Sequence, residues 1–471
     1  MILVAPGGLL AGEASSDRPN VLFIAVDDLR PELGCYGHRS MKTPNIDRLA
    51  TTGTLFGRAY CQQAVCNSSR ASLMTGMRPD TLKVWSLETH FRDARPDALT
   101  IAQHFKAHGY HTERLGKIFH TGHGNRDDKL SWSISPRRAT GSRYGPNALN
   151  DYKKWLATAG ITEHRRDVRR PPWQVARVGD SDLSDGANTD TAIEALREIK
   201  DKPFFLAVGY LNPHLPFVSP KKYWDLYDAR SIGLADNPDP PANAPSHAMT
   251  SWGELRKYYG IPSKGALSEQ QAIKLRHGYY AAVSYIDAMI GRLLAELDRL
   301  GLRENTIVVL WGDHGWKLGE HGGWCKHTNF ELDARVPLIV SAPSQKKKGT
   351  RSEALVEFVD LFPTLCDLGG LPRPNQLDGS SFAGLLDDPA SPHKTEAFSQ
   401  YPRGSRIMGY SMRTDRYRLT LWRDRQSPYE TQAIELYDHV DDPDENVNIA
   451  AEQKGLVVDL QARMMKAGIL K

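Results

Sequence analysis

The chain has 471 residues, of which 40% are hydrophobic and 25% are charged, a composition typical of globular proteins. This length predicts one large domain with a smaller one beside it. The 60 Lys and Arg residues against 56 Asp and Glu give a formal net charge of +4, too small an excess to indicate nucleic-acid binding. No stretch beyond the N-terminus is long and apolar enough to span a membrane. Neither nucleic acid nor a membrane is therefore expected as a partner.

Residues 1–17 predict a truncated signal segment. Residues 2–11 are apolar or small, and residues 12–14 (GEA) resemble a small-x-small cleavage site, although the basic region that opens such signals is missing. A disordered tail is the alternative. On the signal interpretation, the protein is expected to be exported to a periplasm or out of the cell.

Three short apolar runs share one design. Residues 20–26 (NVLFIAV), 203–210 (PFFLAVGY) and 306–311 (TIVVLW) each end in polar or turn-forming residues, which is typical of buried strands. Helical patterns lie between them, at residues 100–108 and 279–300. Alternating strands and helices predict an α/β fold with a mostly parallel sheet, in which ligands bind at the carboxyl ends of the strands.

The remaining segments suggest how the chain divides. Residues 121–145 and 236–245 are expected to be long surface loops, and residues 356–368 an amphipathic helix. Strands are predicted at 408–412, 417–422 and 435–437, followed by a closing helix at 455–467. We therefore expect a main domain over residues 18–385 and a C-terminal α+β subdomain with a small antiparallel sheet over residues 386–471.

Carboxylates follow two of the predicted strands. Asp27 and Asp28 end the first, and Asp313 and His314 end the third. A solvated turn is the ordinary explanation of an isolated Asp-Asp pair, but the second acidic strand end favours a bound cation. Three carboxylates with one imidazole suit calcium or magnesium better than zinc. The five cysteines include no Cys-x-x-Cys pair, which argues against a thiolate zinc site.

A polar start followed by an apolar-periodic stretch places Cys66 at a predicted helix N-terminus, within residues 66–76 (CNSSRASLMTG). Backbone N–H groups at such an end favour anions. Arg70 lies one turn further on the same face and can donate two parallel hydrogen bonds to an oxyanion. The ordinary alternative is a small buried cysteine followed by a surface arginine.

This stretch resembles the signature of the type I sulfatases, Cys-x-Pro-Ser-Arg followed by a hydrophobic pair and Thr-Gly, with Ser68 standing where Pro is usual. The Asp27-Asp28 pair and residues 116–120 (GKIFH), 212–214 (NPH) and 313–315 (DHG) occur in sulfatase order. Within the family, the chain is most similar to the iduronate-2-sulfatase branch. The stretches that carry this similarity are residues 78–81, 116–120, 213–217, 316–330, 399–403 and 407–413, together with His314.

The resemblance implies an alkaline-phosphatase-like fold and a nucleophile made by oxidising Cys66 to formylglycine, which requires a formylglycine-generating or related maturation enzyme as a partner. It implies one calcium ion, rather than magnesium, held by Asp27, Asp28, Cys66 (as the hydrated aldehyde), Asp313 and His314. The catalytic residues that it implies are Cys66, Arg70, Lys117, His120, His214 and Lys326. In this assignment Arg70 holds the hydrate, Lys117 and Lys326 bind the sulfate, His214 protonates the leaving alcohol and His120 assists sulfate release.

The predicted function is hydrolysis of sulfate esters on carbohydrates, and the branch resemblance suggests 2-O-sulfated uronic acid in a glycosaminoglycan or other sulfated polysaccharide. Two alternatives stay open: a phosphomonoester, phosphodiester or phosphonate hydrolase of the same superfamily, and a non-catalytic protein that binds sulfated glycans. Taken singly, Lys117 could be a surface lysine, and His120 and His214 could be core histidines. Lys326 has the weakest local context.

Overall fold

The computed structural model describes residues 18–165, 167–427 and 430–470. The predicted signal segment lies outside the described residues. In the described part of the chain, the main sheet has seven strands in the order β11-β2-β10-β7-β1-β5-β3. Its strands are β1 (Asn20–Val26), β2 (Thr54–Tyr60), β3 (His111–Gly116), β5 (Phe204–Tyr210), β7 (Thr306–Gly312), β10 (Arg335–Ser341) and β11 (Thr350–Glu357). β10 runs antiparallel to both of its neighbours and the other pairings are parallel, so the expected mostly parallel α/β sheet is confirmed.

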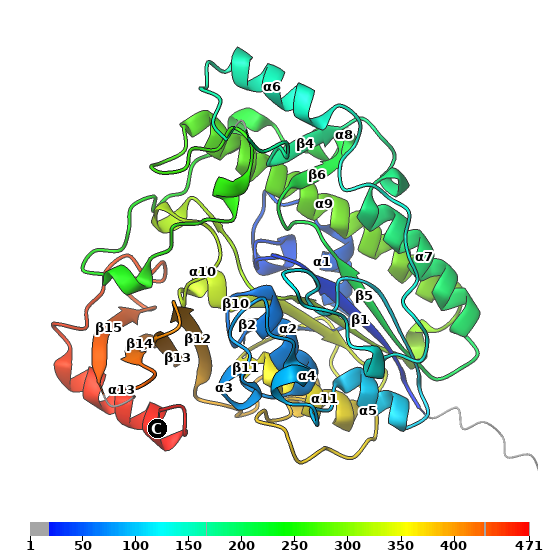
Figure 1. The fold of residues 1–471 in the computed structure, drawn as a ribbon. Coiled ribbons are helices and arrows are strands. Elements are labelled where there is room, and N and C mark those ends of the chain that lie inside the picture. Colours follow the sequence, from blue (N-terminus) through cyan, green and yellow to red (C-terminus); the bar gives the residue numbers. More distant parts are fainter. Residues whose placement is uncertain (1–17, 166, 428–429, 471) are drawn as a thin grey trace, which may run out of the picture.

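Helices cover both faces of this sheet (Figure 1). The helices of the described residues are α1 (Pro44–Thr52), α2 (Cys66–Thr75), α3 (Pro79–Leu82), α4 (Phe91–Ala94), α5 (Ile101–Ala107), α6 (Ala148–Thr158), α7 (Ser184–Ile199), α8 (Lys221–Trp224), α9 (Glu269–Arg299), α10 (Glu331–Ala334), α11 (Leu361–Leu368), α12 (Gly384–Asp387) and α13 (Lys454–Lys466). α1, α7 and α9 pack against one face, and α2, α5 and α11 against the other. Short strand pairs are formed by β4 (Trp173–Ala176) with β6 (Phe217–Pro220) and by β8 (Lys317–Leu318) with β9 (Trp324–Cys325).

The central strand β1 explains why the sheet is covered on both sides. Leu22, Ile24 and Val26 belong to one hydrophobic cluster, whereas Val21 and Phe23 belong to the other. All are fully buried, because successive side chains of a strand point to opposite faces of the sheet. A continuous apolar run is what a strand buried on both faces requires.

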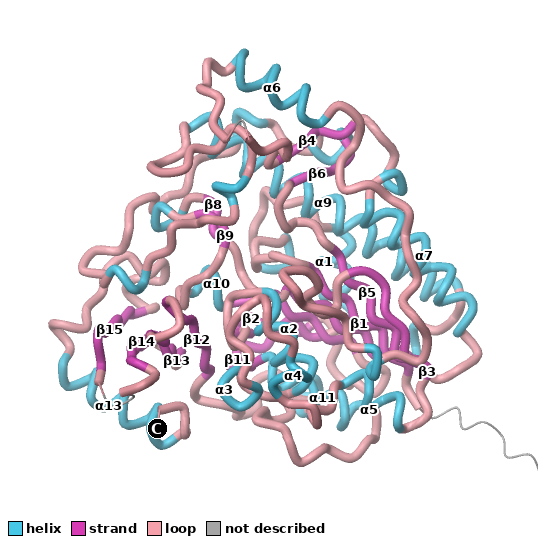
Figure 2. The backbone as a smooth tube through the Cα atoms, in the orientation of Figure 1, coloured by secondary structure: helices cyan, strands magenta, loops and turns pink. Residues whose placement is uncertain are grey.

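The C-terminal domain contains a second, antiparallel sheet (Figure 2). Its strands are β12 (Ala397–Arg403), β13 (Ile407–Arg413), β14 (Tyr417–Asp424) and β15 (Thr431–Asp438), in that order. α13 packs against this sheet through Val457, Leu460 and Met464. These elements confirm the strands and the closing helix that were predicted here, and the boundary at residue 385 stays a prediction.

Two helix predictions need correction. α9 begins at Glu269, ten residues before the predicted start, because Ser268 and Gln271 form a capping box that ends the preceding loop. The helix predicted over residues 356–368 is wrong in its first part. The end of β11, which pairs with β2, and a 3₁₀ turn (Phe358–Asp360) precede α11. Sheet pairing therefore overrides the local helical pattern.

A close backbone approach at the end of β5 positions the segment that follows β3. A Cβ atom added to Gly209 would lie 2.0 Å from the carbonyl oxygen of Lys117, and the N–H of Lys117 donates to the Gly209 carbonyl at 3.1 Å. Gly209→Ala is therefore expected to lower the free energy of unfolding by about 1–3 kcal/mol through overpacking. Denaturant unfolding measures this, with Gly455→Ala as the matched control, because no atom lies within 4 Å of its added Cβ. Equal stability of Gly209→Ala and the unsubstituted protein would contradict the expectation.

Candidate active site

Four acidic and imidazole side chains meet at the carboxyl ends of two neighbouring strands. Asp27 and Asp28 directly follow β1, and Asp313 and His314 directly follow β7, its parallel neighbour. All four are fully buried. Parallel strands bring their carboxyl ends to one edge of the sheet, so residues far apart in the sequence become neighbours.

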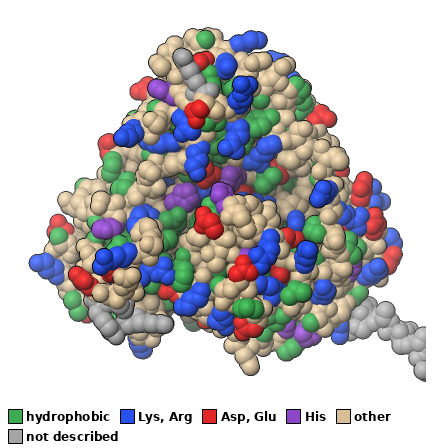
Figure 3. All heavy atoms as spheres, viewed as in Figure 1, with side chains coloured by type: hydrophobic (Ala, Val, Ile, Leu, Met, Phe, Trp, Pro, Cys, Tyr) green, Lys and Arg blue, Asp and Glu red, His purple; other side chains and the backbone are tan. Residues whose placement is uncertain are grey.

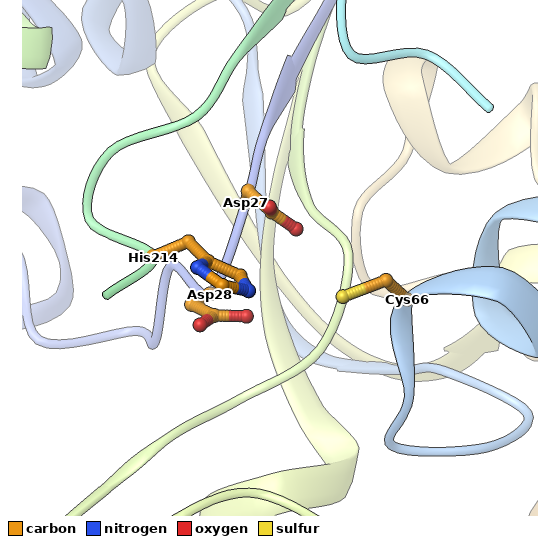
Figure 4. A group of neighbouring side chains, drawn as sticks. All are labelled: Asp27, Asp28, Cys66 and His214. Atoms are coloured by element: carbon orange, nitrogen blue, oxygen red, sulfur yellow. The ribbon is translucent and has the colours of Figure 1, made fainter. Parts of the chain in front are cut away.

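Cys66 faces this cluster from the opposite side. It is the first residue of α2 and is 3% exposed, which confirms its predicted place at a helix N-terminus. Figure 4 shows its sulfur pointing toward Asp27, Asp28 and His214. The ligand atoms of Asp27, Cys66, Asp313 and His314 lie within 4.8 Å of one another, as do those of Asp27, Asp28, Cys66 and His214. Burial raises the pKa of the Cys66 thiol well above its usual value, so the unmodified side chain is a neutral thiol.

The donor set fits a hard divalent cation. The carboxylates of Asp27, Asp28 and Asp313 supply oxygen atoms, which calcium and magnesium prefer. His314 Nδ1 lies 3.0 Å from the Gly315 carbonyl. Its Nε2 faces the cluster, 3.4 Å from Asp28 Oδ1 and 3.3 Å from Cys66 Sγ. A ring that donates through one nitrogen and offers the other to the site has the usual arrangement of a metal-ligating histidine.

Three cations balance the three carboxylates. Arg70 is fully buried and donates from Nε to Asp313 at 2.8 Å and from its terminal nitrogen to Asp27 at 3.1 Å. Lys117 pairs with Asp27, and Lys326 Nζ lies 3.0 Å from Asp28 Oδ1. Burial alone would raise the pKa of Asp27, but the charges of Lys117 and Arg70 hold it well below the usual range. Burial raises the pKa of Asp28 to about 7, against the opposing charge of Lys326.

His214 and Glu254 form one wall of the site. His214 Nδ1 is 2.6 Å from the Leu215 carbonyl, and Nε2 is 3.0 Å from Glu254 Oε1. The other Glu254 oxygen lies 2.8 Å from Lys326 Nζ. Burial lowers the pKa of His214 to about 4. Although burial would raise the pKa of Glu254, the charges of Lys326 and His214 lower it below the usual range. One carboxylate therefore contacts two of the predicted catalytic side chains.

His120 lines the pocket next to His123. Its Nε2 is 3.3 Å from Nδ1 of His123, and the two rings are stacked. Burial, together with the charge of Lys117, lowers its pKa to about 3. The ring is therefore neutral at ordinary pH, the form in which a histidine can accept a proton.

A pocket of about 590 Å³ opens from Cys66 to the surface, and Figure 3 shows histidine and basic side chains around the hollow near the centre of the view. Its lining comprises Val65, Cys66, Leu87, His120, His123, Arg170, His214, Met249, Thr250, Ser251, Gly253, Glu254, Lys257, Tyr258, Lys326, His327, Tyr401 and Arg403. Glu254 is the one carboxylate among these described lining residues. The pocket is thus strongly basic and suits an anionic ligand.

The structure brings together every predicted site residue, since Arg70 and Lys117 contact the cluster that Cys66, His214 and Lys326 face. Four further histidines divide into two pairs: His123 and His327 line the pocket, whereas His90 stacks on Phe91 and His321 contacts the Asp444 carbonyl. The five cysteines, all within the described residues, form no disulfide.

Sequence reasoning missed the pocket residues Glu254, Lys257, Tyr258 and Arg403. The first three lie in an irregular segment around a 3₁₀ turn (Leu255–Lys257), and Arg403 ends β12. Arg170 was missed as well, because it lies in a stretch rich in arginine, and such a stretch is usually a solvated loop. The Pro-rich loop before residue 246 gave the single hint, since long loops in compact domains are often functional.

Comparison with known proteins assigns the family. The sulfatase family model matches residues 19–371. The chain belongs to the sulfatase family. It is a sulfuric ester hydrolase, and its residues 319–468 also match the model of the C-terminal domain of N-sulphoglucosamine sulphohydrolase.

Two relatives and two solved structures show how far the likeness extends. The sulfatase is 36% identical to iduronate 2-sulfatase of Homo sapiens, over 89% of this chain and 88% of that protein. It is 30% identical to a sulfatase of Formosa agariphila, over 92% and 83% of the two chains. Phosphonate monoester hydrolase of Agrobacterium radiobacter superposes with a TM-score of 0.74 at 22% identity, covering 96% of both chains. BT4656, solved with D-glucosamine-2-N,6-O-disulfate, gives 0.73 at 22% identity and covers 96% and 98% of the two chains. These structures bear out the alkaline-phosphatase-like fold. Among the described helices of this sulfatase, none has the length and apolar character needed to cross a membrane.

Proposed function

We propose that this sulfatase removes sulfate esters from acidic carbohydrates, with 2-O-sulfated uronic acid as the best candidate. The observation that carries the proposal is the pocket that opens from Cys66. Besides Lys326 near the buried cluster, it is lined by Arg170, Lys257 and Arg403, for which no carboxylate partner occurs among the described residues. A substrate with a carboxylate beside its sulfate would use this charge. Similarity to iduronate 2-sulfatase supports the same choice.

The nucleophile is proposed to come from Cys66 after oxidation to formylglycine. Because Cys66 is 3% exposed, the maturation enzyme has to act before folding closes the site. The adjacent helix start carries Ser68, whose hydroxyl is buried without a partner among the described residues. Peptide mass spectrometry over residues 66–70 of active protein tests this step, and finding only the unmodified thiol in active enzyme would refute it.

We propose that Asp27, Asp28, Asp313, His314 and the modified residue 66 hold a calcium ion. Bound there, the cation would neutralise sulfate charge and lower the pKa of a hydroxyl group. With all groups ionised, the carboxylates of Asp27, Asp28, Asp313 and Glu254 stand against the three cations Arg70, Lys117 and Lys326, which gives a net charge of −1. A divalent ion would therefore leave the site positive, which suits a sulfate ester.

The remaining roles follow from position. Lys117 and Lys326 bind sulfate oxygens and stabilise charge that develops in the transition state, and Arg70 orients residue 66. His214 donates a proton to the departing sugar oxygen. The anionic ester beside its ring favours the protonated form of a histidine whose pKa burial has lowered to about 4. His120, neutral in the free enzyme, accepts the proton that is lost as sulfate leaves.

Glu254 is proposed to position His214 and Lys326, which it contacts at 3.0 and 2.8 Å. Glu254→Gln is expected to lower kcat for sugar sulfates by about 10- to 100-fold, less than the roughly 10²- to 10⁴-fold that a general acid contributes, because His214 itself stays in place. The kcat for aryl sulfates with acidic leaving groups should fall little, because the departing oxygen of these substrates does not need to be protonated. Steady-state kinetics on both substrate types, with exposed Glu452→Gln as the control, test this. An equal loss on both would indicate that Glu254 acts through Lys326 or the fold and does not position His214.

Parallel assays separate the rival activities. Release of sulfate from 2-O-sulfated uronate disaccharides is expected, at a higher kcat/KM than phosphate release from aryl phosphate. Faster phosphate or phosphonate turnover would favour the phosphohydrolase alternative, to which the structural likeness to phosphonate monoester hydrolase draws attention. Tight binding of sulfated glycans without turnover by fully matured protein would favour the glycan-binding alternative.

Export of the protein is proposed from residues 1–17, and N-terminal sequencing of secreted protein tests it.

A further inference from the structure

A second cavity, of about 560 Å³, lies between the α3 region and the C-terminal domain. In Figure 1, α3 is seen beside β12 and β13. Its 14 lining residues come from residues 78–95, 400–425 and 468–470. Five of them are basic and two are acidic, so the cavity carries a positive charge that the proposed reaction does not use.

The two acidic residues of this cavity are already engaged. Asp80 accepts hydrogen bonds from the Trp85 indole at 2.6 Å, from Gln400 at 2.9 Å and from the Tyr410 hydroxyl at 2.7 Å. Asp424 pairs with Arg406. The hydrogen bonds of Asp80 join the α3 region to β12 and β13. None of them involves a basic side chain of the cavity.

Two of the basic groups are available to a ligand. Lys83 Nζ and the Arg425 guanidinium lie 5.8 and 3.9 Å from the centroid of the Trp85 ring, and neither has a carboxylate partner within the described residues. Arg78, in contrast, is bound to Glu357. The ammonium group of Lys83 and the planar guanidinium of Arg425 both lie near the Trp85 ring. Together they can donate hydrogen bonds to the oxygen atoms of a sulfate or a carboxylate.

The cavity and the active-site pocket are lined from the same two chain segments. Trp85 and Gln400 line it, whereas Leu87 and Tyr401, their near neighbours in the chain, line the active-site pocket. The two hollows therefore lie on either side of the same two segments. A saccharide that occupied both hollows at once would have to be longer than a single sugar sulfate.

We propose that this cavity is a second, non-catalytic binding site for a sulfated saccharide chain, with Lys83 and Arg425 as its anion contacts. The choice of ligand rests on the proposed function, but the site itself is independent of turnover. Occupation of both hollows would favour longer sulfated chains over sugar sulfates of one or two residues. It makes no difference to small aryl sulfates, which reach only the active-site pocket.

The test compares Lys83→Ala/Arg425→Ala with Lys347→Ala/Lys348→Ala, a matched loss of two charges on an exposed loop whose ion pairs are long, at 3.5 and 4.0 Å. Calorimetric titration with a size-defined heparin oligosaccharide is expected to show at least tenfold weaker binding for the first variant and unchanged binding for the second. The kcat/KM for long sulfated oligosaccharides should fall in parallel, while aryl sulfate turnover stays unchanged.

Equal binding by both variants and the unsubstituted protein, or no binding of the oligosaccharide at all, would overturn the proposed site. Equal weakening by both variants would also overturn it, because the effect would then be one of overall charge. The protein could instead show no sulfatase turnover, while the Lys83→Ala/Arg425→Ala variant still binds the oligosaccharide more weakly than the control variant. That result would count against the proposed function and would leave the second site standing.

Discussion

Replacing Cys66 by alanine is expected to abolish sulfate ester hydrolysis while leaving the fold intact. Loss of a nucleophile costs about 10⁴- to 10⁶-fold in kcat where the remaining groups still bind the substrate. Here Lys117, Lys326 and His214 would stay in place, so substrate binding should persist without turnover. Sulfate release measured under saturating substrate checks the loss, and calorimetric binding of the substrate checks that the pocket survives.

Cys366→Ala is the matched control for this substitution. Cys366 is fully buried in α11, within the hydrophobic cluster on the α2 side of the sheet, and contributes nothing to the pocket. It should keep full activity at a modest cost in stability, the usual consequence of shortening a buried side chain. If the Cys66 variant turned over substrate at a rate comparable to this control, a different nucleophile would have to be sought.

The local parts of this site could be predicted from the sequence. Asp27 and Asp313 were found because each ends an apolar strand run, and the strands that carry them, β1 and β7, were found with nearly their observed bounds. Cys66 was found because a polar start leads into a helical pattern. In each case the signal lies within about ten residues, which is the range that strand and helix periodicity can report.

Other parts depend on contacts that no local pattern encodes. Glu254 gains its place by pairing with Lys326 and His214, residues far from it in the chain. Arg403, at the end of β12, donates hydrogen bonds to the backbone carbonyl oxygens of residues 247, 248 and 327. These residues lie 76 or more positions away from it in the chain. The last two residues of the edge strand β11, Val356 and Glu357, were predicted as the start of a helix because the apolar pattern of α11 extends over them. Tertiary pairing decides such cases, and a single sequence does not contain it.

Removal of bound metal is expected to stop turnover and to lower the temperature of unfolding, and added calcium should restore both. A ligand that binds only the folded state stabilises it by about 3–4 kcal/mol at 100 to 1,000 times its dissociation constant. Treatment with a chelator, followed by calorimetry with calcium or magnesium, measures the effect. Asp28→Asn is the informative variant, because it removes one carboxylate of the site and should abolish the calcium-dependent shift.

The charge state of Asp28 adds a pH dependence to this metal effect. Burial raises its pKa to about 7 in the cation-free site, whereas a carboxylate must be ionised to bind a cation. Below pH 7, calcium therefore has to displace a proton from Asp28, and its affinity should weaken progressively as the pH falls. Above pH 7 the carboxylate is already ionised and the affinity should level off. Titration calorimetry at several pH values measures this, and a calcium affinity that stays constant between pH 5 and pH 8 would show that Asp28 does not carry a proton in this range.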